Sequence, residues 1–113
     1  MPKRIKLMAE YGGFVLWGED PGDMGAIDAD DLPLQPETRF RLKRWAAVYD
    51  AMLNWDDPGN TPDWPPEVRN WFDQEGFALW RILREELGPE YEVSYYSKKH
   101  QRLFTDPEEL PRD

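Results

Sequence analysis

The sequence predicts an α+β domain in which a small, mainly antiparallel sheet of three to four strands carries two helices on one face. Segments near residues 3–10 and 91–96 alternate in polarity, which indicates strands. Two longer segments, 36–53 and 65–87, repeat apolar residues at spacings of three and four, which is typical of helices. The order strand, strand, helix, helix, strand predicts this class.

The N-terminal residues are predicted to form two paired strands. In "KRIKLMAEY", Ile5, Leu7 and Ala9 fall on one face, which predicts a strand over 3–10. A Gly-Gly pair interrupts the alternation, and "FVLW" at 14–17 then indicates a second short strand. The two strands are near enough in sequence to pair as a hairpin.

Residues 19–34 are predicted to be a loop, because prolines and glycines interrupt regular structure and six acids repel one another. Four apolar residues are expected to hold this loop against the domain: Met24, Ile27, Leu32 and Leu34. A helix is predicted over 36–53, because Pro36 suits a first helical position and Glu37 is favourable in the first turn.

The stretch "NWDDPGNTPDWPP" is predicted to be a stiff, acidic connection to a second helix. That helix begins at Pro65 or Pro66 and ends at Leu87, before a Gly-Pro pair. Gly76 lowers helix stability by about 1 kcal/mol relative to Ala, so it predicts a close approach to a neighbouring element. "YEVSYYS" predicts a strand beside the first one, "RLF" a last short strand, and 105–113 a tail that is loose or docked through Leu110.

Composition limits the function classes. The 113 residues, 40% hydrophobic and 14% aromatic, are expected to form one domain over 1–113. The chain has no cysteine, which excludes disulfides, thiol catalysis and thiolate zinc sites. A net charge of −9 opposes binding to nucleic acid or anionic membrane and favours a basic partner, although solubility alone also explains it. Without a signal-peptide pattern or membrane span, a cytoplasmic, bacterial protein is expected.

The sequence shows no catalytic set. His100 in "SKKHQ" has no carboxylate near it in sequence, and Ser94 and Ser97 stand in no glycine-flanked elbow. The acid clusters "DADD" and "WDDPGN" offer oxygen ligands for Ca2+ or Mg2+ but lack the order of a calcium loop. No cofactor and no enzymatic activity are predicted, and the alternative is a small carboxylate-dependent enzyme or divalent-cation-binding module.

The charges are segregated along the chain. Residues 7–38 hold eight acids and no base, and 45–68 hold five acids and no base. The predicted first helix begins with four bases, Arg39, Arg41, Lys43 and Arg44, beside the positive end of the helix dipole. The acidic loop at about 19–35 is expected to compensate them.

The two acidic loops, about 19–35 and 54–65, also carry large aromatic residues near their acids. Aromatic anchors surrounded by steering charges are typical of a surface that binds a basic protein. The alternative for the tryptophans is that they close the core beneath long loops. The predicted partner-binding residues are Trp17, Glu19, Asp20, Asp23, Asp28, Asp30, Asp31, Trp55, Asp56, Asp57 and Trp64.

Four segments carry a family resemblance: "KRIKLMAEYGGFVLW", "IDADDLPL", "YDAMLNWDDP" and "ELGPEYEVSYYS". Together they resemble a group of small uncharacterised bacterial proteins with the pattern K-I-K-L-M-A-x-Y-G and, later, Y-D-A-x-L-N-x-D-D-P. Proteins of this kind are similar in size and charge to immunity proteins that neutralise secreted bacterial toxins. Val15 stands where the pattern has Pro, and Gln35-Pro36 replaces a Ser helix cap. The resulting prediction is an acidic protein-binding module, an immunity protein that occludes the active surface of a basic toxin domain.

Overall fold

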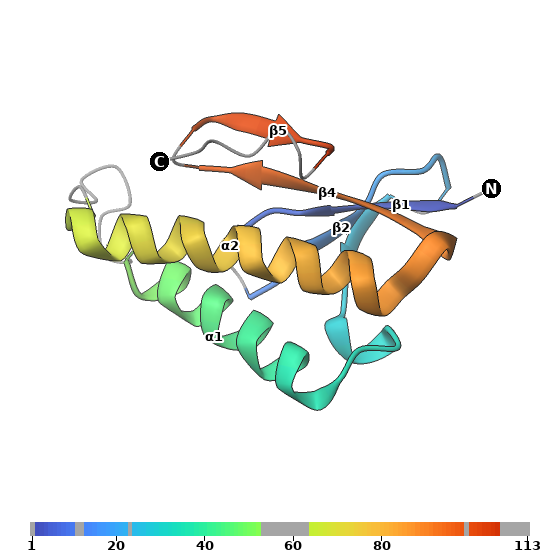
Figure 1. Ribbon diagram of the computed structural model, residues 1–113, viewed down its shortest axis with the longest axis horizontal. Coiled ribbons are helices and arrows are strands. Elements are labelled where there is room, and N and C mark those ends of the chain that lie inside the picture. The colour runs from blue at the N-terminus through green and yellow to red at the C-terminus, as the bar shows by residue number, and fades with distance from the viewer. Residues whose placement is uncertain (1, 11–12, 23, 53–63, 99, 107–113) are drawn as a thin grey trace.

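A five-stranded mixed sheet lies against two helices, which cover one of its faces (Figure 1). This computed structural model describes residues 2–10, 13–22, 24–52, 64–98 and 100–106. The strands are β1 (Lys3–Leu7), β2 (Leu16–Gly18), β3 (Gly25–Ile27), β4 (Tyr91–Ser97) and β5 (Arg102–Phe104). The helices are α1 (Pro36–Ala51) and α2 (Pro66–Leu87), with short 3₁₀ turns at η1 (Ala29–Asp31) and η3 (Gly88–Glu90). Both helices follow β3 and precede β4 in the chain.

The strands lie in the order β3-β2-β1-β4-β5 across the sheet. The predicted hairpin of the first two strands is confirmed, since β1 and β2 pair antiparallel with Leu7 opposite Leu16. The predicted contact between the first strand and "YEVSYYS" is confirmed as well, since Ile5 of β1 lies opposite Val93 of β4. The strands with the strongest alternation therefore form the centre of the sheet.

The sheet differs from the prediction in size and in direction. It has five strands rather than three to four, because β3 lies inside the segment predicted to be a loop. β3 has no alternating apolar pattern, and it forms through backbone pairing with β2, where Trp17 lies opposite Ala26. The central β1–β4 pair is parallel, because the chain crosses from one strand to the other through both helices. The other three pairs are antiparallel.

The helix bounds agree closely with the prediction. α1 begins at Pro36 and ends at Ala51, two residues before the predicted end. α2 covers Pro66–Leu87, within the predicted range. A proline occupies the first turn of each helix, where its missing N–H leaves no intrahelical bond unmade.

The core fills the space between the helices and the sheet. α2 packs directly on β4, and α1 packs beside α2 (Figure 1). Trp45 of α1 stacks on Phe72 of α2, with ring centroids 4.4 Å apart. The predicted close approach at Gly76 is confirmed, because an added Cβ would overlap the Tyr95 hydroxyl and lie 3.0 Å from Cζ2 of Trp45. A glycine at this point allows α2 to lie against β4.

The opposite face of the sheet, here called the outer face, carries no helix of the described chain (Figure 1). Buried residues such as Ile5, Leu7, Val93 and Tyr95 point toward the helices. Because strand side chains alternate, the residues between them point to the outer face. These outer-face residues are Arg4, Lys6, Trp17, Glu92, Ser94 and Tyr96.

Candidate functional site

Three of the predicted acids gather in one exposed turn, which we call the acidic corner and which consists of Asp28, Asp30 and Asp31. The turn is held locally, because the Asp28 carboxylate accepts a hydrogen bond from the Asp30 backbone N–H at 2.9 Å and caps η1. Leu32 and Leu34 follow the turn and are buried, so they fix it to the core as predicted. All three side chains of the acidic corner are exposed.

One of the four residues expected to hold the acidic loop behaves differently. Met24 is 75% exposed, so the prediction that it anchors the loop is wrong. It directly precedes β3, whose first residue, Gly25, has a positive φ of 122°. Ile27 is partly buried and packs against the core, as predicted.

A small hollow of about 170 Å3 opens beside the acidic corner, between β2, β3 and α1. Its apolar lining includes Phe14, Ile27 and Ala29, and its charged lining residues are Asp28 and Lys43. Phe14 is 45% exposed, although the neighbouring residues of "FVLW" are buried. The corner therefore combines carboxylates with an accessible apolar recess large enough for one side chain. Phe14 was not among the predicted contact residues, because no pattern within the apolar run "FVLW" distinguishes the exposed residue from the buried ones.

The remaining described acids of the first loop have partners within the chain. Asp20 accepts hydrogen bonds from the backbone N–H and the Nε of Arg4, both at 2.9 Å. These bonds hold the pKa of the Asp20 carboxyl below its usual range. Glu19 accepts a 3.2 Å hydrogen bond from the Ser94 hydroxyl on the outer face. Both acids are thus oriented by neighbouring strands.

The two described tryptophans of the predicted surface are partly buried. Trp17 lies on the outer face, and its indole N–H donates to the Met8 carbonyl at 2.8 Å. Trp64 packs against the core, with edge-to-face contacts to Tyr49 and Phe72. Four other predicted contact residues lie outside the described residues: Asp23, Trp55, Asp56 and Asp57. Their roles stay predictions.

The bases at the start of α1 are compensated mainly from another helix. Arg41 forms two hydrogen bonds to the Glu75 carboxylate of α2, at 2.7 and 3.0 Å, and Arg44 forms a third at 3.2 Å. These bonds hold the pKa of Glu75 below its usual value. Lys43 alone pairs with the acidic corner, through Asp30 at 3.3 Å. The expectation that the acidic loop compensates these bases is therefore correct for Lys43 and, through the Leu32 carbonyl that accepts from Arg39 at 2.7 Å, for Arg39, but wrong for Arg41 and Arg44.

A buried polar cluster joins α2 to the end of β4. The Asp73 carboxylate accepts hydrogen bonds from the hydroxyls of Tyr95, at 3.0 Å, and Ser97, at 2.7 Å. His100 Nε2 lies 3.3 Å from the other Asp73 oxygen, so this histidine has a neighbouring carboxylate that its sequence context does not show. Burial of the Tyr95 side chain, and secondly the negative charge of Asp73, raise the pKa of Tyr95. The hydroxyl therefore keeps its proton and donates it in the hydrogen bond.

This cluster does not have the geometry of nucleophilic catalysis. In a Ser-His-Asp triad the histidine lies between the serine and the carboxylate, whereas here Asp73 lies between Ser97 and His100. The Ser97 side chain is fully buried, and its oxygen accepts the backbone N–H of His100 at 3.2 Å. The arrangement orders the turn after β4.

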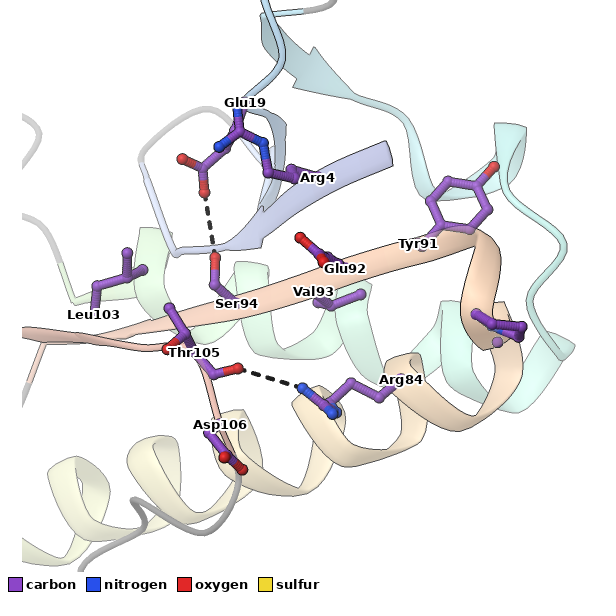
Figure 2. A pocket seen from close by; sticks show the side chains of 12 residues that line it. Arg4, Glu19, Arg84, Tyr91, Glu92, Val93, Ser94, Leu103, Thr105 and Asp106 are labelled. Atoms are coloured by element: carbon purple, nitrogen blue, oxygen red, sulfur yellow. Dashed lines mark hydrogen bonds between the residues drawn. The ribbon is translucent and has the colours of Figure 1, made fainter. Parts of the chain in front are cut away.

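A larger hollow, of about 810 Å3, lies at the free side of β4 (Figure 2). Outer-face side chains such as Glu19, Glu92 and Ser94 border one side of it, and Arg84 of α2 borders the other. Arg84 donates to the Thr105 carbonyl at 3.4 Å, where the chain leaves β5. This hollow is larger than the recess beside the acidic corner, and it borders one predicted contact residue, Glu19.

Within the described residues, no group of three His, Asp or Glu side chains is placed to hold a metal ion. None of the helices in the described ranges is long and apolar enough to cross a membrane.

The sequence matches one protein family over residues 3–98, a range that includes both helices and four of the five strands. That family is described as Serratia CdiI immunity protein-like. No curated protein matches the sequence. Because the match covers most of its length, the chain belongs to the Serratia CdiI immunity protein-like family.

Proposed function

We propose that this protein is an immunity protein that neutralises a bacterial toxin by binding a basic surface of the toxin with its acidic corner. The family match carries the proposal, because an immunity protein-like family implies a toxin as partner. The proposed action is binding without catalysis, in the cytoplasm, and it involves neither nucleic acid nor membrane. A cysteine-free sequence is compatible with a reducing compartment.

Charge supports a basic partner. The chain has a net charge of −9, and the acidic corner adds three exposed carboxylates within four residues. Of these, only Asp30 pairs with a described base, Lys43, and both partners in that pair are more than half exposed. Exposed acids of this kind steer a basic partner and accelerate the encounter at low salt.

Shape supports an anchored contact at the same place. The recess beside Phe14 has room for one apolar side chain, and Asp28 lies at its border. An aromatic or aliphatic anchor with charges around it is the usual arrangement of an interface hot spot. The acidic corner therefore has a component for steering and a component for holding the partner.

The test uses the product of the gene adjacent to the one that encodes this protein. Expression of that product is expected to arrest growth, and co-expression of this protein is expected to restore it. The association rate of the purified pair should then fall about tenfold in Asp28→Asn/Asp31→Asn at low salt, because steering depends on these charges. Raising the salt should reduce the difference.

A matched control removes the same charge elsewhere. Glu67→Gln/Glu85→Gln neutralises two exposed acids of α2 that do not line the recess. This variant should change the association rate less than twofold. Equal association rates for the two double variants would contradict binding through the acidic corner, and lack of growth rescue would contradict the immunity function.

A further inference from the structure

We propose that the free edge of β4 binds an extended, basic segment of the partner by adding it to the sheet as a further strand. The inference rests on the proposed function for the identity of the partner, a toxin. It adds a second contact site, on a different part of the molecule from the acidic corner. The segment that we expect to bind is in strand conformation and carries a Lys or Arg side chain.

The first observation is that β5 is shorter than β4. β5 pairs only with Tyr95–Ser97, whereas β1 on the other side pairs with β4 from Tyr91 to Tyr95. Beyond Phe104 the chain turns toward α2, where the Thr105 carbonyl accepts a hydrogen bond from Arg84. Residues 91–94 of β4 are consequently an edge of the described sheet.

The second observation concerns the direction of the backbone groups at this edge. The backbone carbonyl of Arg4 in β1 and the backbone N–H of Met8, just after β1, form hydrogen bonds on the β2 side. The backbone groups of the odd-numbered residues of β1 therefore point toward β4. In a parallel pair they bond to the even-numbered residues of β4, so the backbone groups of the odd-numbered residues of β4 point away from β1. The N–H and C=O groups of Tyr91 and Val93 therefore point out of the sheet.

Two of these four groups already have partners. The Val93 carbonyl accepts a hydrogen bond from the Trp80 indole N–H at 2.6 Å. The Tyr91 N–H donates to the carbonyl of Gly88, the first residue of η3. Neither the Val93 N–H nor the Tyr91 carbonyl has a hydrogen-bond partner in the part of the chain that the structure describes. One donor and one acceptor, two residues apart, are the groups that an added strand pairs with.

The larger hollow lies directly over this edge (Figure 2). Four consecutive residues of β4 line it, from Tyr91 to Ser94. Val93 is 3% exposed, whereas Tyr91 and Ser94 are partly exposed and Glu92 is exposed. The volume of about 810 Å3 is sufficient for several residues of extended chain. A partner segment in the hollow would therefore lie along this edge.

Charge favours a basic segment at Glu92, in a hollow that Arg4 and Arg84 also line. Pairing of the edge with a second copy of β4 would bring Glu92 close to Glu92 of the other chain, and like charges across strands are destabilising. Glu92 is exposed on the outer face, and Glu19 lies on the same side of the hollow. A Lys or Arg opposite Glu92 forms a favourable cross-strand pair instead. A basic segment of another protein is thus preferred to self-association.

The backbone amide of Val93 provides a direct test. In amide hydrogen exchange and 15N NMR, Val93 should exchange rapidly in the free protein and slow at least tenfold in the complex with the growth-arresting partner. The Ser94 amide, which bonds toward β1, should be protected in both states and serves as the internal control. The same spectra are recorded with the acetylated hexapeptide Thr-Lys-Thr-Lys-Thr-Lys and with its Glu-containing counterpart.

A charge exchange tests the chemistry of the segment. Glu92→Lys should lower the affinity for the Lys peptide about fivefold and raise the affinity for the Glu peptide by a similar factor. The reason is that an opposite-charge pair across strands contributes up to about 1 kcal/mol, or roughly fivefold in affinity. Glu85→Lys makes the same change in net charge on exposed α2 and should leave the preference for the Lys peptide intact. Equal effects of the two variants would overturn the assignment of the basic residue to Glu92.

The outcomes separate this inference from the proposed function. If the partner is neutralised but the Val93 amide stays unprotected, the edge proposal is overturned and the immunity function stands. If the Lys peptide protects Val93 while the adjacent gene product does not bind, the immunity function falls, and with it the toxin as the source of the segment. Protection of Val93 by both the partner and the Lys peptide supports the proposal.

Discussion

Two regions of the molecule differ in how completely their polar groups are satisfied within the protein. Where α2 packs against β4 and α1, the Asp73 carboxylate is surrounded by Tyr95, Ser97 and His100, and the Trp45 indole donates to the Phe72 carbonyl at 2.8 Å. At the acidic corner and along the β4 edge, carboxylates such as those of Asp31 and Glu92 are exposed. The same residue types therefore serve packing in one region and remain available to a partner in the other.

This comparison shows that the residue type alone does not determine whether a side chain is available to a partner. A buried carboxylate such as Asp73 has its hydrogen-bonding capacity used inside the fold, since an unpaired buried charge is costly. An exposed carboxylate such as Asp31 retains its capacity for a partner. Changes at the packing contacts of α2 should accordingly alter stability, and changes at the acidic corner or the β4 edge should alter binding. Four variants test this separation, from the largest expected change in the free energy of unfolding to the smallest.

Gly76→Ala should cause the largest loss of stability, about 2–3 kcal/mol, although alanine is the better helix former. The added methyl group would lie 2.6 Å from Cζ of Tyr95 as well as close to Trp45, and both rings are buried. Chemical denaturation measures the change. Asn70→Ala, at an exposed position of α2, is the matched control and should stay within about 0.5 kcal/mol. A stable Gly76→Ala protein would show that α2 can move away from β4 at little cost.

Glu75→Gln should destabilise the protein by about 2 kcal/mol at pH 7, because it removes a largely buried carboxylate shared by two arginines. The pKa of Glu75 is depressed below its usual value of 4.5, so its contribution is complete above that pH. The contribution is lost as the pH falls through the lower pKa of the folded state. The stability difference between wild type and variant should therefore shrink on acidification.

Denaturation curves at pH 7 and at successively lower pH test this dependence on Glu75. Glu85→Gln, which changes an exposed acid of the same helix, should show little difference from wild type at any pH. A difference for Glu75→Gln that stays constant across the pH range would contradict an ionised Glu75 as the source of the stabilisation.

Glu86→Ala should cost about 1 kcal/mol, the usual value of a helix N-cap. Glu86 of α2 accepts hydrogen bonds from the Gln35 backbone N–H, at 2.7 Å, and from the Thr38 hydroxyl, at 2.5 Å. It holds the start of α1, a helix that has no local side-chain cap. Introducing Gln35→Ser into the Glu86→Ala protein should recover part of the loss in denaturation experiments. No recovery would indicate that the main role of Glu86 is to connect the two helices.

Phe14→Ser should change the free energy of unfolding by less than about 0.5 kcal/mol, because Phe14 is substantially exposed. It should nevertheless weaken binding of the growth-arresting partner about tenfold, because it removes the apolar wall of the recess. Calorimetric titration measures the affinity. Phe40→Ser changes another exposed phenylalanine that does not line the recess, and should leave the affinity unchanged. An equal loss in both variants would contradict the recess as an anchor site.

Much of the architecture is predictable from local pattern. The apolar stripes predict both helices within about two residues, because helix formation here follows from a continuous amphipathic repeat. The alternation in "KRIKL" and "YEVSYYS" predicts the two central strands and their contact. Gly76 predicts a close helix contact, because only a packing requirement offsets the cost of glycine in a helix.

Other features depend on partners that no local pattern identifies. β3 forms because its backbone pairs with β2, so a segment rich in glycine and acids became a strand. His100 meets Asp73 because α2 passes beneath the turn after β4. Glu75 compensates Arg41 across two helices, where sequence proximity favours the acidic loop. Each of these contacts joins residues at least seven positions apart in the chain.

The two helices, the central strands and the segregation of acidic from basic residues are predictable from the sequence alone, since they depend on the order of neighbouring side chains. Which carboxylates are used inside the fold and which remain exposed depends on tertiary contacts, as in the contrast of Asp73 with Asp31. Strand pairing also sets where β5 ends, so that the Val93 N–H lies at an edge of the described sheet. The physical reason is that burial and hydrogen-bond pairing depend on which elements meet in space.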